Sequence, residues 1–103
     1  MLVLSRMAGE RILIGSRNVV TVTKVRKSQV SLLIEAPFLQ VSRDEVPGSG
    51  RITDGRLVFS RKKGQGFTIA GMINVSVLKI QGKRVRIGIT APKDVQVRRH
   101  EIV

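Results

Sequence analysis

The sequence predicts an all-β protein of about ten short strands, built from two copies of one unit. Apolar and polar residues alternate over most of the chain, which is the period of strands with one buried face. Glycine, proline and serine interrupt these stretches, as they do at turns between strands. No stretch of the 103 residues shows a sustained helical period with capping residues. These observations predict the fold class before any motif is considered.

A repeat at an offset of 55 residues divides the chain into the two copies. Leu57-Val-Phe-Ser-Arg61 repeats Leu2-Val-Leu-Ser-Arg6, and Val75-x-Val77-x-Lys79 repeats Val20-x-Val22-x-Lys24. Self-similarity in a constant register is the signature of a structural repeat. We therefore expect the same order of strands in both copies.

The domain boundaries follow from this repeat. The predicted first unit covers residues 1–46, a linker rich in proline, glycine and serine covers 47–55, and the second unit covers 56–103. Each unit is near the size at which a hydrophobic core becomes marginal. We expect the two copies to share one core.

Each predicted strand is bounded by a turn signal. In the first copy we expect strands at Met1–Arg6, Ile12–Ile14, Val19–Val25, Val30–Glu35 and Gln40–Val46. In the second copy we expect them at Leu57–Lys62, Phe67–Ile69, Ile73–Ile80, Val85–Thr90 and Val95–Val103. The fourth strand of each copy runs into Ala-Pro, at 36–37 and 91–92, and proline has no N–H to give to a ladder.

The charge balance indicates a polyanionic partner. The chain has 19 Lys and Arg against 7 Asp and Glu, a formal net charge of +12. Such an excess raises the local concentration of phosphate groups and favours nucleic acid. A membrane surface would call for a basic amphipathic helix, and no segment shows one. The alternative is a solvated surface that is merely basic and has no polyanionic partner.

The residue types argue against an enzyme, a cofactor or a metal site. The chain has no cysteine and a single histidine, His100, which lies among charged residues and reads as a surface or contact residue. Gly64-Gln-Gly66 lacks the third glycine and the helix of a dinucleotide loop, so we interpret it as a turn. The absence of cysteine, of a leader and of a membrane-length apolar run leads us to expect a soluble cytoplasmic protein.

Recurring arginines are the best candidates for binding residues. The period of two puts Leu2, Leu4 and Arg6 on one face of the first strand, and Leu57, Phe59 and Arg61 on the matching face in the second copy. After one position is lost near residue 38, Arg43 and Arg99 hold matching places in the last strand of each copy. The alternative for these two is an ion pair with Glu45 or Glu101, which is worth little at a surface.

With three Phe and no Tyr or Trp, base stacking on aromatic side chains is nearly unavailable. Recognition would have to use arginine, aliphatic contacts and backbone groups at a strand edge. Such readout suits unpaired bases in an RNA loop better than duplex DNA.

Several motifs together resemble the carbon storage regulator (CsrA/RsmE) family. They are Met1-Leu-x-Leu-x-Arg6, Gly9-Glu10, Ile14-Gly15 and Ala91-Pro-Lys-x-Val-x-Val-x-Arg-x-Glu-Ile102. The resemblance covers nearly all of the chain outside the linker. It implies units of five strands and a C-terminal helix that interlace as a homodimer, and a translational repressor that binds GGA-containing loops in messenger RNA leaders and in small regulatory RNAs.

Carried onto this chain, the resemblance implies an intramolecular pseudo-dimer of two interlaced units. The chain is expected to depart from the family by lacking the C-terminal helix of both copies, since the linker stands where the first helix should be. It implies a first RNA site at Leu4, Arg6, Val97, Arg98 and Arg99, and a second at Phe59, Arg61, Lys62, Val41, Ser42 and Arg43. The copies differ: Met7 stands where the second copy has Lys62, and Leu33 where it has Gly88. We therefore expect unequal sites, the one with Arg99 being tighter.

Two further questions stay open from the sequence. The chain is expected to be a monomer, and the alternative is a dimer in which copies exchange between chains. The alternative function is a protein-interaction module that has lost RNA binding and titrates regulator partners.

Overall fold

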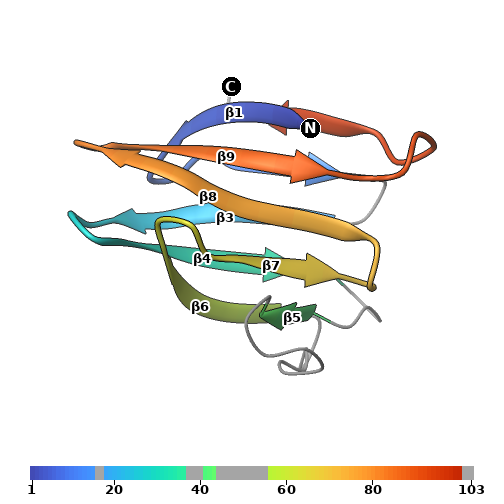
Figure 1. Cartoon of the computed structure of the whole chain (residues 1–103), viewed down its shortest axis with the longest axis horizontal. Coiled ribbons are helices and arrows are strands. Elements are labelled where there is room, and N and C mark those ends of the chain that lie inside the picture. Colours follow the sequence, from blue (N-terminus) through green and yellow to red (C-terminus); the bar gives the residue numbers. More distant parts are fainter. Residues whose placement is uncertain (16–17, 37–40, 44–55, 101–103) are drawn as a thin grey trace.

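A computed structural model describes residues 1–15, 18–36, 41–43 and 56–100 of the chain. Within these residues it contains ten strands and no helix, so the all-β prediction is confirmed (Figure 1). The first copy supplies β1 (Leu2–Met7), β2 (Arg11–Ile14), β3 (Asn18–Val25), β4 (Gln29–Glu35) and β5 (Val41–Arg43). The second copy supplies β6 (Arg56–Lys62), β7 (Gly66–Ile69), β8 (Ile73–Gln81), β9 (Arg84–Thr90) and β10 (Val97–His100).

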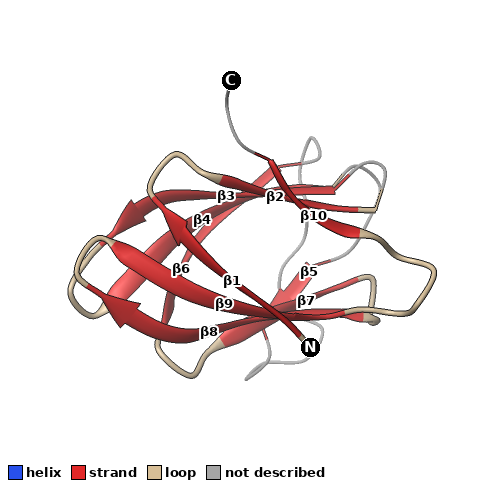
Figure 2. Ribbon diagram, turned by 90° about the horizontal axis from the view of Figure 1, so that it is seen from above, coloured by secondary structure: helices blue, strands red, loops and turns tan. Residues whose placement is uncertain are grey.

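The two copies interlace in two antiparallel sheets. The first sheet has the order β1-β9-β8-β7-β5 and the second the order β10-β2-β3-β4-β6. Each copy therefore supplies the three central strands of one sheet and both edge strands of the other. Figure 2 shows the two sheets as layers on either side of the interior. The predicted pseudo-dimer of interlaced units is confirmed.

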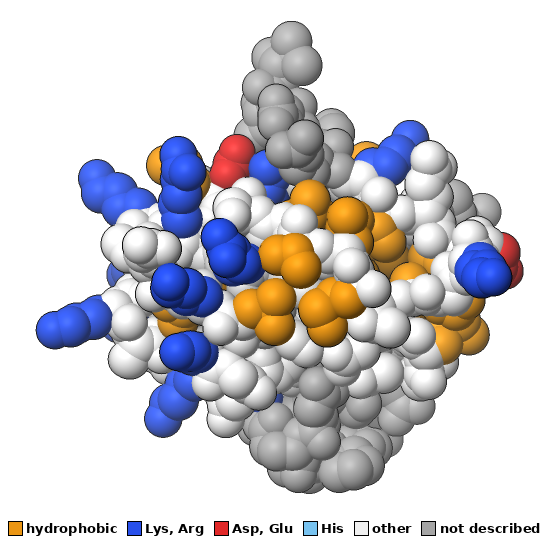
Figure 3. Space-filling model, turned by 45° about the horizontal axis from the view of Figure 1, so that its top comes forward, with side chains coloured by type: hydrophobic (Ala, Val, Ile, Leu, Met, Phe, Trp, Pro, Cys, Tyr) orange, Lys and Arg blue, Asp and Glu red, His pale blue; other side chains and the backbone are white. Residues whose placement is uncertain are grey.

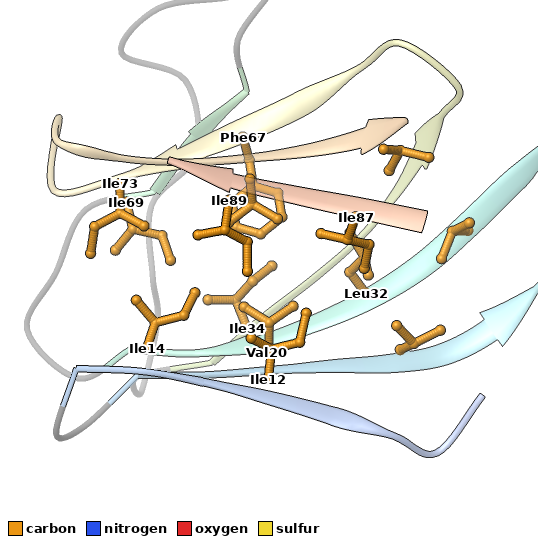
Figure 4. Close-up of a cluster of buried hydrophobic side chains, with 14 of the residues drawn as sticks. Ile12, Ile14, Val20, Leu32, Ile34, Phe67, Ile69, Ile73, Ile87 and Ile89 are labelled. Carbon is orange, nitrogen blue, oxygen red and sulfur yellow. The ribbon is translucent and has the colours of Figure 1, made fainter. Parts of the chain in front are cut away.

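The core between the sheets is shared by the copies. The alternation of apolar and polar residues produces this core: β4 buries every second residue, and β8 buries every second one of its first five. In Figure 4, isoleucines and a valine from the second sheet face Phe67 and isoleucines from the first. Burial of each such side chain contributes about 1.5–3 kcal/mol. Separating the copies would expose this surface, so the chain behaves as one folding unit.

The last strand starts later than the sequence predicted. β10 begins at Val97, whereas we expected a strand from Val95. The Val95 N–H donates to the Pro92 carbonyl at 3.0 Å, which closes a turn over the residues after β9. Pro92, which follows β9, thus also begins this turn. Val95 and Gln96 are therefore not part of β10. The predicted end of the strand, at residues 101–103, lies outside the described residues.

Some of the predicted segments lie wholly or partly outside the described residues. Of the expected strand Gln40–Val46, the structure describes β5, Val41–Arg43. The linker 47–55 lies outside the described residues, so the boundaries 1–46, 47–55 and 56–103 stay a prediction. Glu45 and Glu101, and with them the ion pairs given as the alternative for Arg43 and Arg99, also lie outside the described residues.

Candidate nucleic-acid interface

The first strand of one copy meets the last strand of the other at the edges of the two sheets. β1 is an edge of the first sheet and β10 an edge of the second, and they lie side by side in Figure 2. An open hollow of about 490 Å³ is lined by Leu2, Val3, Leu4 and Ser5 of β1 and by Val97 of β10. We call this place the β1–β10 seam. The repeat puts the equivalent strands, β6 and β5, at the opposite edges of the same two sheets.

Most side chains that line the β1–β10 seam are aliphatic, and strand-edge polar groups lie between them. Leu4 and Val97 are half-buried and pack against the core, while Leu2, Val3 and Met7 are exposed. Figure 3 shows an apolar area on this side of the molecule, bordered by a group of Lys and Arg side chains. A strand edge beside exposed apolar side chains offers backbone donors and acceptors together with aliphatic contacts. The arrangement suits a flat, partly polar ligand.

Arg6 and Arg61 are buried, with 3% and 6% of their surface exposed. The register pairs Arg6 with buried Val85, so the face that it shares with Leu4 is the inner face of β1. Arg6 Nε donates to the Ser5 carbonyl at 2.7 Å, and its Nη1 donates to the Arg11 carbonyl at 3.4 Å. A buried guanidinium is tolerated only when such partners replace water. Arg6 therefore ties β1 to the start of β2.

Arg61 repeats this arrangement in the second copy. Its Nε donates to the Ser60 carbonyl at 2.8 Å and its Nη1 to the Gly66 carbonyl at 3.4 Å, at the start of β7. The copies differ in the turn beside it. Arg6 Nη1 lies 3.9 Å from a carboxylate oxygen of Glu10, whose other oxygen accepts from the Met7 N–H at 2.6 Å. In the second copy Gln65 stands in the place of Glu10, and its side-chain oxygen accepts from the Lys62 N–H at 2.9 Å.

The predicted residues of the first site do not all lie on one side. β10 pairs with β2 so that Val97 and Arg99 stand opposite Ile14 and Ile12, and Arg98 stands opposite Leu13. Arg98 is exposed on the other face of β10 from Val97. The structure thus brings Leu4 and Val97 into one hollow, puts Arg6 beneath β1, and separates Arg98 from them. The side chain of Arg99 lies outside the described residues.

The second predicted site is described in part. Lys62 is exposed at the end of β6, and Arg61 is buried. Val41, Ser42 and Arg43 stand opposite Ile69, Thr68 and Phe67 in the ladder of β5 with β7. The side chains of these three residues and of Phe59 lie outside the described set.

A group of cations near the first seam was missed from the sequence. Lys79, Arg84 and Arg86 are exposed and line a second hollow of about 270 Å³, together with Ser5, Gln81 and Val85. The signal was available: the alternation in Arg84-Val-Arg86 puts both arginines on one face, and the aligned residues of the first copy, Gln29 and Ser31, are uncharged.

Within the described ranges, no group of three or more His, Cys, Asp and Glu side chains is placed to hold a metal ion. Nor does any helix long and apolar enough to cross a membrane occur there.

Comparison with known proteins places the repeat in a family. The chain matches CsrA, described as a global regulator protein family, over residues 1–49 and again over 57–103. The chain belongs to the CsrA family. The double match confirms that it is a tandem of two CsrA units. No solved structure matches it.

Two curated relatives are both named translational regulator CsrA. The one from Thermosipho africanus (strain TCF52B) is 52% identical over 46 residues, which are 45% of this chain and 63% of the relative. The one from Pseudothermotoga lettingae (strain ATCC BAA-301 / DSM 14385 / NBRC 107922 / TMO) is 50% identical over 46 residues, 45% of this chain and 60% of the relative. Each alignment thus covers about one copy, and about three-fifths of the relative's length.

Proposed function

We propose that this CsrA tandem is an RNA-binding regulator of translation. It binds GGA-containing loops in messenger RNA leaders, and in small regulatory RNAs, and represses translation in the cytoplasm by covering the ribosome-binding region. The observation that carries the proposal is the β1–β10 seam, where a hollow lined by aliphatic side chains and strand-edge polar groups lies between two sheet edges in a chain of net charge +12. The relatives' name, translational regulator, supports it.

The chemistry of the seam suits unpaired bases. β1 pairs with β9 and is otherwise an edge of its sheet, so its outward N–H and C=O groups are available to base edges. Leu4 and Val97 supply aliphatic contact to a base. Arg99, two residues along β10 from Val97, supplies a charge-assisted contact to a phosphate or a guanine. No step of chemistry is involved, because repression by coverage needs only binding.

The two arginines beneath the first strands have a different part in this proposal. Arg6 and Arg61 bond to backbone carbonyls of their own copies. We assign them to holding β1 and β6 in position, so that the outward backbone groups keep a fixed spacing. Direct contacts then fall to Leu4, Val97 and Arg99 at the first site, from which Arg98 is separated on the other face of β10, and to Phe59, Lys62, Val41, Ser42 and Arg43 at the second.

Gel shifts with two RNA hairpins test the proposal. One carries GGA in its loop, and the control has the same stem with the loop order scrambled. We expect the GGA hairpin to bind at least tenfold more tightly, and its affinity to fall with salt as phosphate contacts release counterions. Equal affinity for both would exclude sequence-specific readout. Absence of binding above a non-specific level would favour a protein-interaction module.

A further inference from the structure

The outer face of the first sheet carries three clustered cations, where the matching place on the second sheet has two, Lys24 and Lys62. We call Lys79, Arg84 and Arg86 the outer cationic patch; all three are exposed and line one hollow of about 270 Å³. Arg86 stands directly opposite Lys79 on β8, and Arg84 stands opposite Gln81. Figure 3 shows Lys and Arg side chains gathered beside the apolar area.

This placement is unfavourable for the protein alone. Directly opposed residues of an antiparallel pair have Cβ atoms about 4.5–5.5 Å apart, and like charges there destabilise the sheet. Among the described residues, the ion pairs are Arg6–Glu10 and Arg56–Glu35, and neither involves the patch. A bound polyanion would remove the repulsion between Lys79 and Arg86. The patch is therefore suited to phosphate groups.

The same place on the second sheet provides a matched comparison. The repeat aligns Lys79, Arg84 and Arg86 with Lys24, Gln29 and Ser31. There the Oγ atoms of Ser31 and Ser60 lie 3.4 Å apart, and Thr23 Oγ1 donates to the Ser31 carbonyl at 3.1 Å. Uncharged residues thus satisfy the fold at the places of Arg84 and Arg86, so the fold does not require these two arginines.

The patch is continuous with the β1–β10 seam. Ser5 lines both hollows, the one at the seam and the one at the patch. It also stands opposite Arg86 in the ladder of β1 with β9. Neighbouring strands lie about 4.8 Å apart, so Arg86 and Lys79 are within about 10 Å of β1. An RNA held at the seam has its flanking phosphates within reach of the patch.

We propose that the outer cationic patch binds the phosphates of an RNA stem whose loop is held in the β1–β10 seam. Duplex RNA is recognised mainly through its shape and phosphates, which a flat cationic surface can contact without reading bases. At the β5–β6 site the matching surface has Lys24 and Lys62 but no counterpart of Arg84 and Arg86, so the two sites differ in what they bind: the first prefers a loop on a stem more strongly than the second does. This inference rests on the proposed function, and it names the RNA structure that one site prefers.

Exchanging the aligned residues of the two copies tests it. Arg84→Gln with Arg86→Ser gives the first sheet the residues of the second, and Gln29→Arg with Ser31→Arg does the reverse. The probes are a GGA hairpin, the same loop as a linear RNA without a stem, and the hairpin with a scrambled loop. Binding to each is measured over a range of salt concentrations.

We expect Arg84→Gln/Arg86→Ser to lose roughly tenfold in hairpin affinity at the tighter site and less than twofold for linear RNA. The slope of log affinity against log salt for the hairpin should fall by about 2, since two phosphate contacts are lost. The reverse exchange should raise hairpin affinity at the other site. An equal loss for hairpin and linear RNA, or no loss for either, would overturn the proposal.

The scrambled hairpin separates this proposal from the one on which it rests. If it binds native protein as tightly as the GGA hairpin, and the exchange weakens both, loop readout fails and the stem contact stands. If the exchange leaves both hairpins unchanged while the GGA loop is still preferred, the stem contact fails and loop readout stands. Unfolding curves show that the variants are folded, and removal of the opposed charges should leave their stability equal or slightly higher.

Discussion

At the scale of single residues, Arg6 shows how a charged side chain can serve a binding surface without reaching it. The alternation alone correctly puts it on the same face of β1 as Leu4, and the structure shows that this is the inner face. Whether the guanidinium then extends to solvent or bonds to backbone depends on where the carbonyls at the start of β2 lie. That position is set by the turn between β1 and β2 and by tertiary packing, so the sequence pattern cannot supply it.

Replacement of Arg6 by Ala should therefore destabilise the protein. The change removes charge-assisted hydrogen bonds, each worth about 1.5–3 kcal/mol, and leaves a space beneath β1. We expect the free energy of unfolding in urea to fall by about 2–3 kcal/mol. Arg98→Ala, at an exposed position of β10, is the control and should change it by less than about 0.5 kcal/mol. An unchanged stability for Arg6→Ala would contradict its role beneath the strand.

At the scale of elements, the strands were predictable because their alternation is nearly unbroken. Nine of the ten elements in the structure begin within one residue of the predicted start. β10 is the exception, since a turn closed by a hydrogen bond from Val95 to Pro92 is a local contact that alternation does not report. The outer cationic patch could have been found by comparing the copies position by position.

The equivalent strands β9 and β4 are packed differently, and Gly88 on β9 shows the difference. A Cβ atom built at Gly88 would lie 2.8 Å from Met1 Sδ and 2.9 Å from Leu78 Cδ1. In the first copy Leu33 takes this place, and the residue aligned with Leu78 is the smaller Thr23. The glycine on β9 thus makes room for larger side chains from its neighbours.

We expect Gly88→Leu to cost about 1–3 kcal/mol, because the added side chain must displace Met1 and Leu78. The double variant Gly88→Leu with Leu78→Thr restores the pairing of the first copy and should recover part of the loss. Thermal unfolding of Gly88→Leu, Leu78→Thr and the double variant measures this. The explanation is wrong if the double variant loses as much as the two single changes added together.

At the scale of the whole molecule, the interlaced topology makes each copy incomplete without the other. Both edge strands of each sheet come from the copy that does not form its centre. The repeat and the small size of each copy predicted a shared core, and the core residues confirm it. The exchange of edge strands was predicted from the family resemblance, because alternation indicates strands and cannot indicate their partners.

Because one chain contains both halves, we expect a monomer of 11.4 kDa in solution. Native mass spectrometry across a hundredfold range of protein concentration checks this. The control is a chain with residues 47–55 shortened, which should favour exchange of copies between chains and raise the dimer fraction. A dimer of the native chain at every concentration would contradict the prediction.

The pairing of strands across copies is the central claim for function, and RNA stoichiometry tests it most directly. Leu4→Ala is combined once with Arg99→Ala, from the other copy, and once with Arg43→Ala, from the same copy. Both double variants carry the same cost at Leu4, so only the arginine differs. Titration calorimetry with a GGA hairpin counts the sites that remain. The account predicts that Leu4→Ala/Arg99→Ala keeps one site at native affinity, while Leu4→Ala/Arg43→Ala weakens both by roughly tenfold to a hundredfold. The reverse pattern, with one native site kept in Leu4→Ala/Arg43→Ala, would show that each copy binds RNA by itself and would contradict the account.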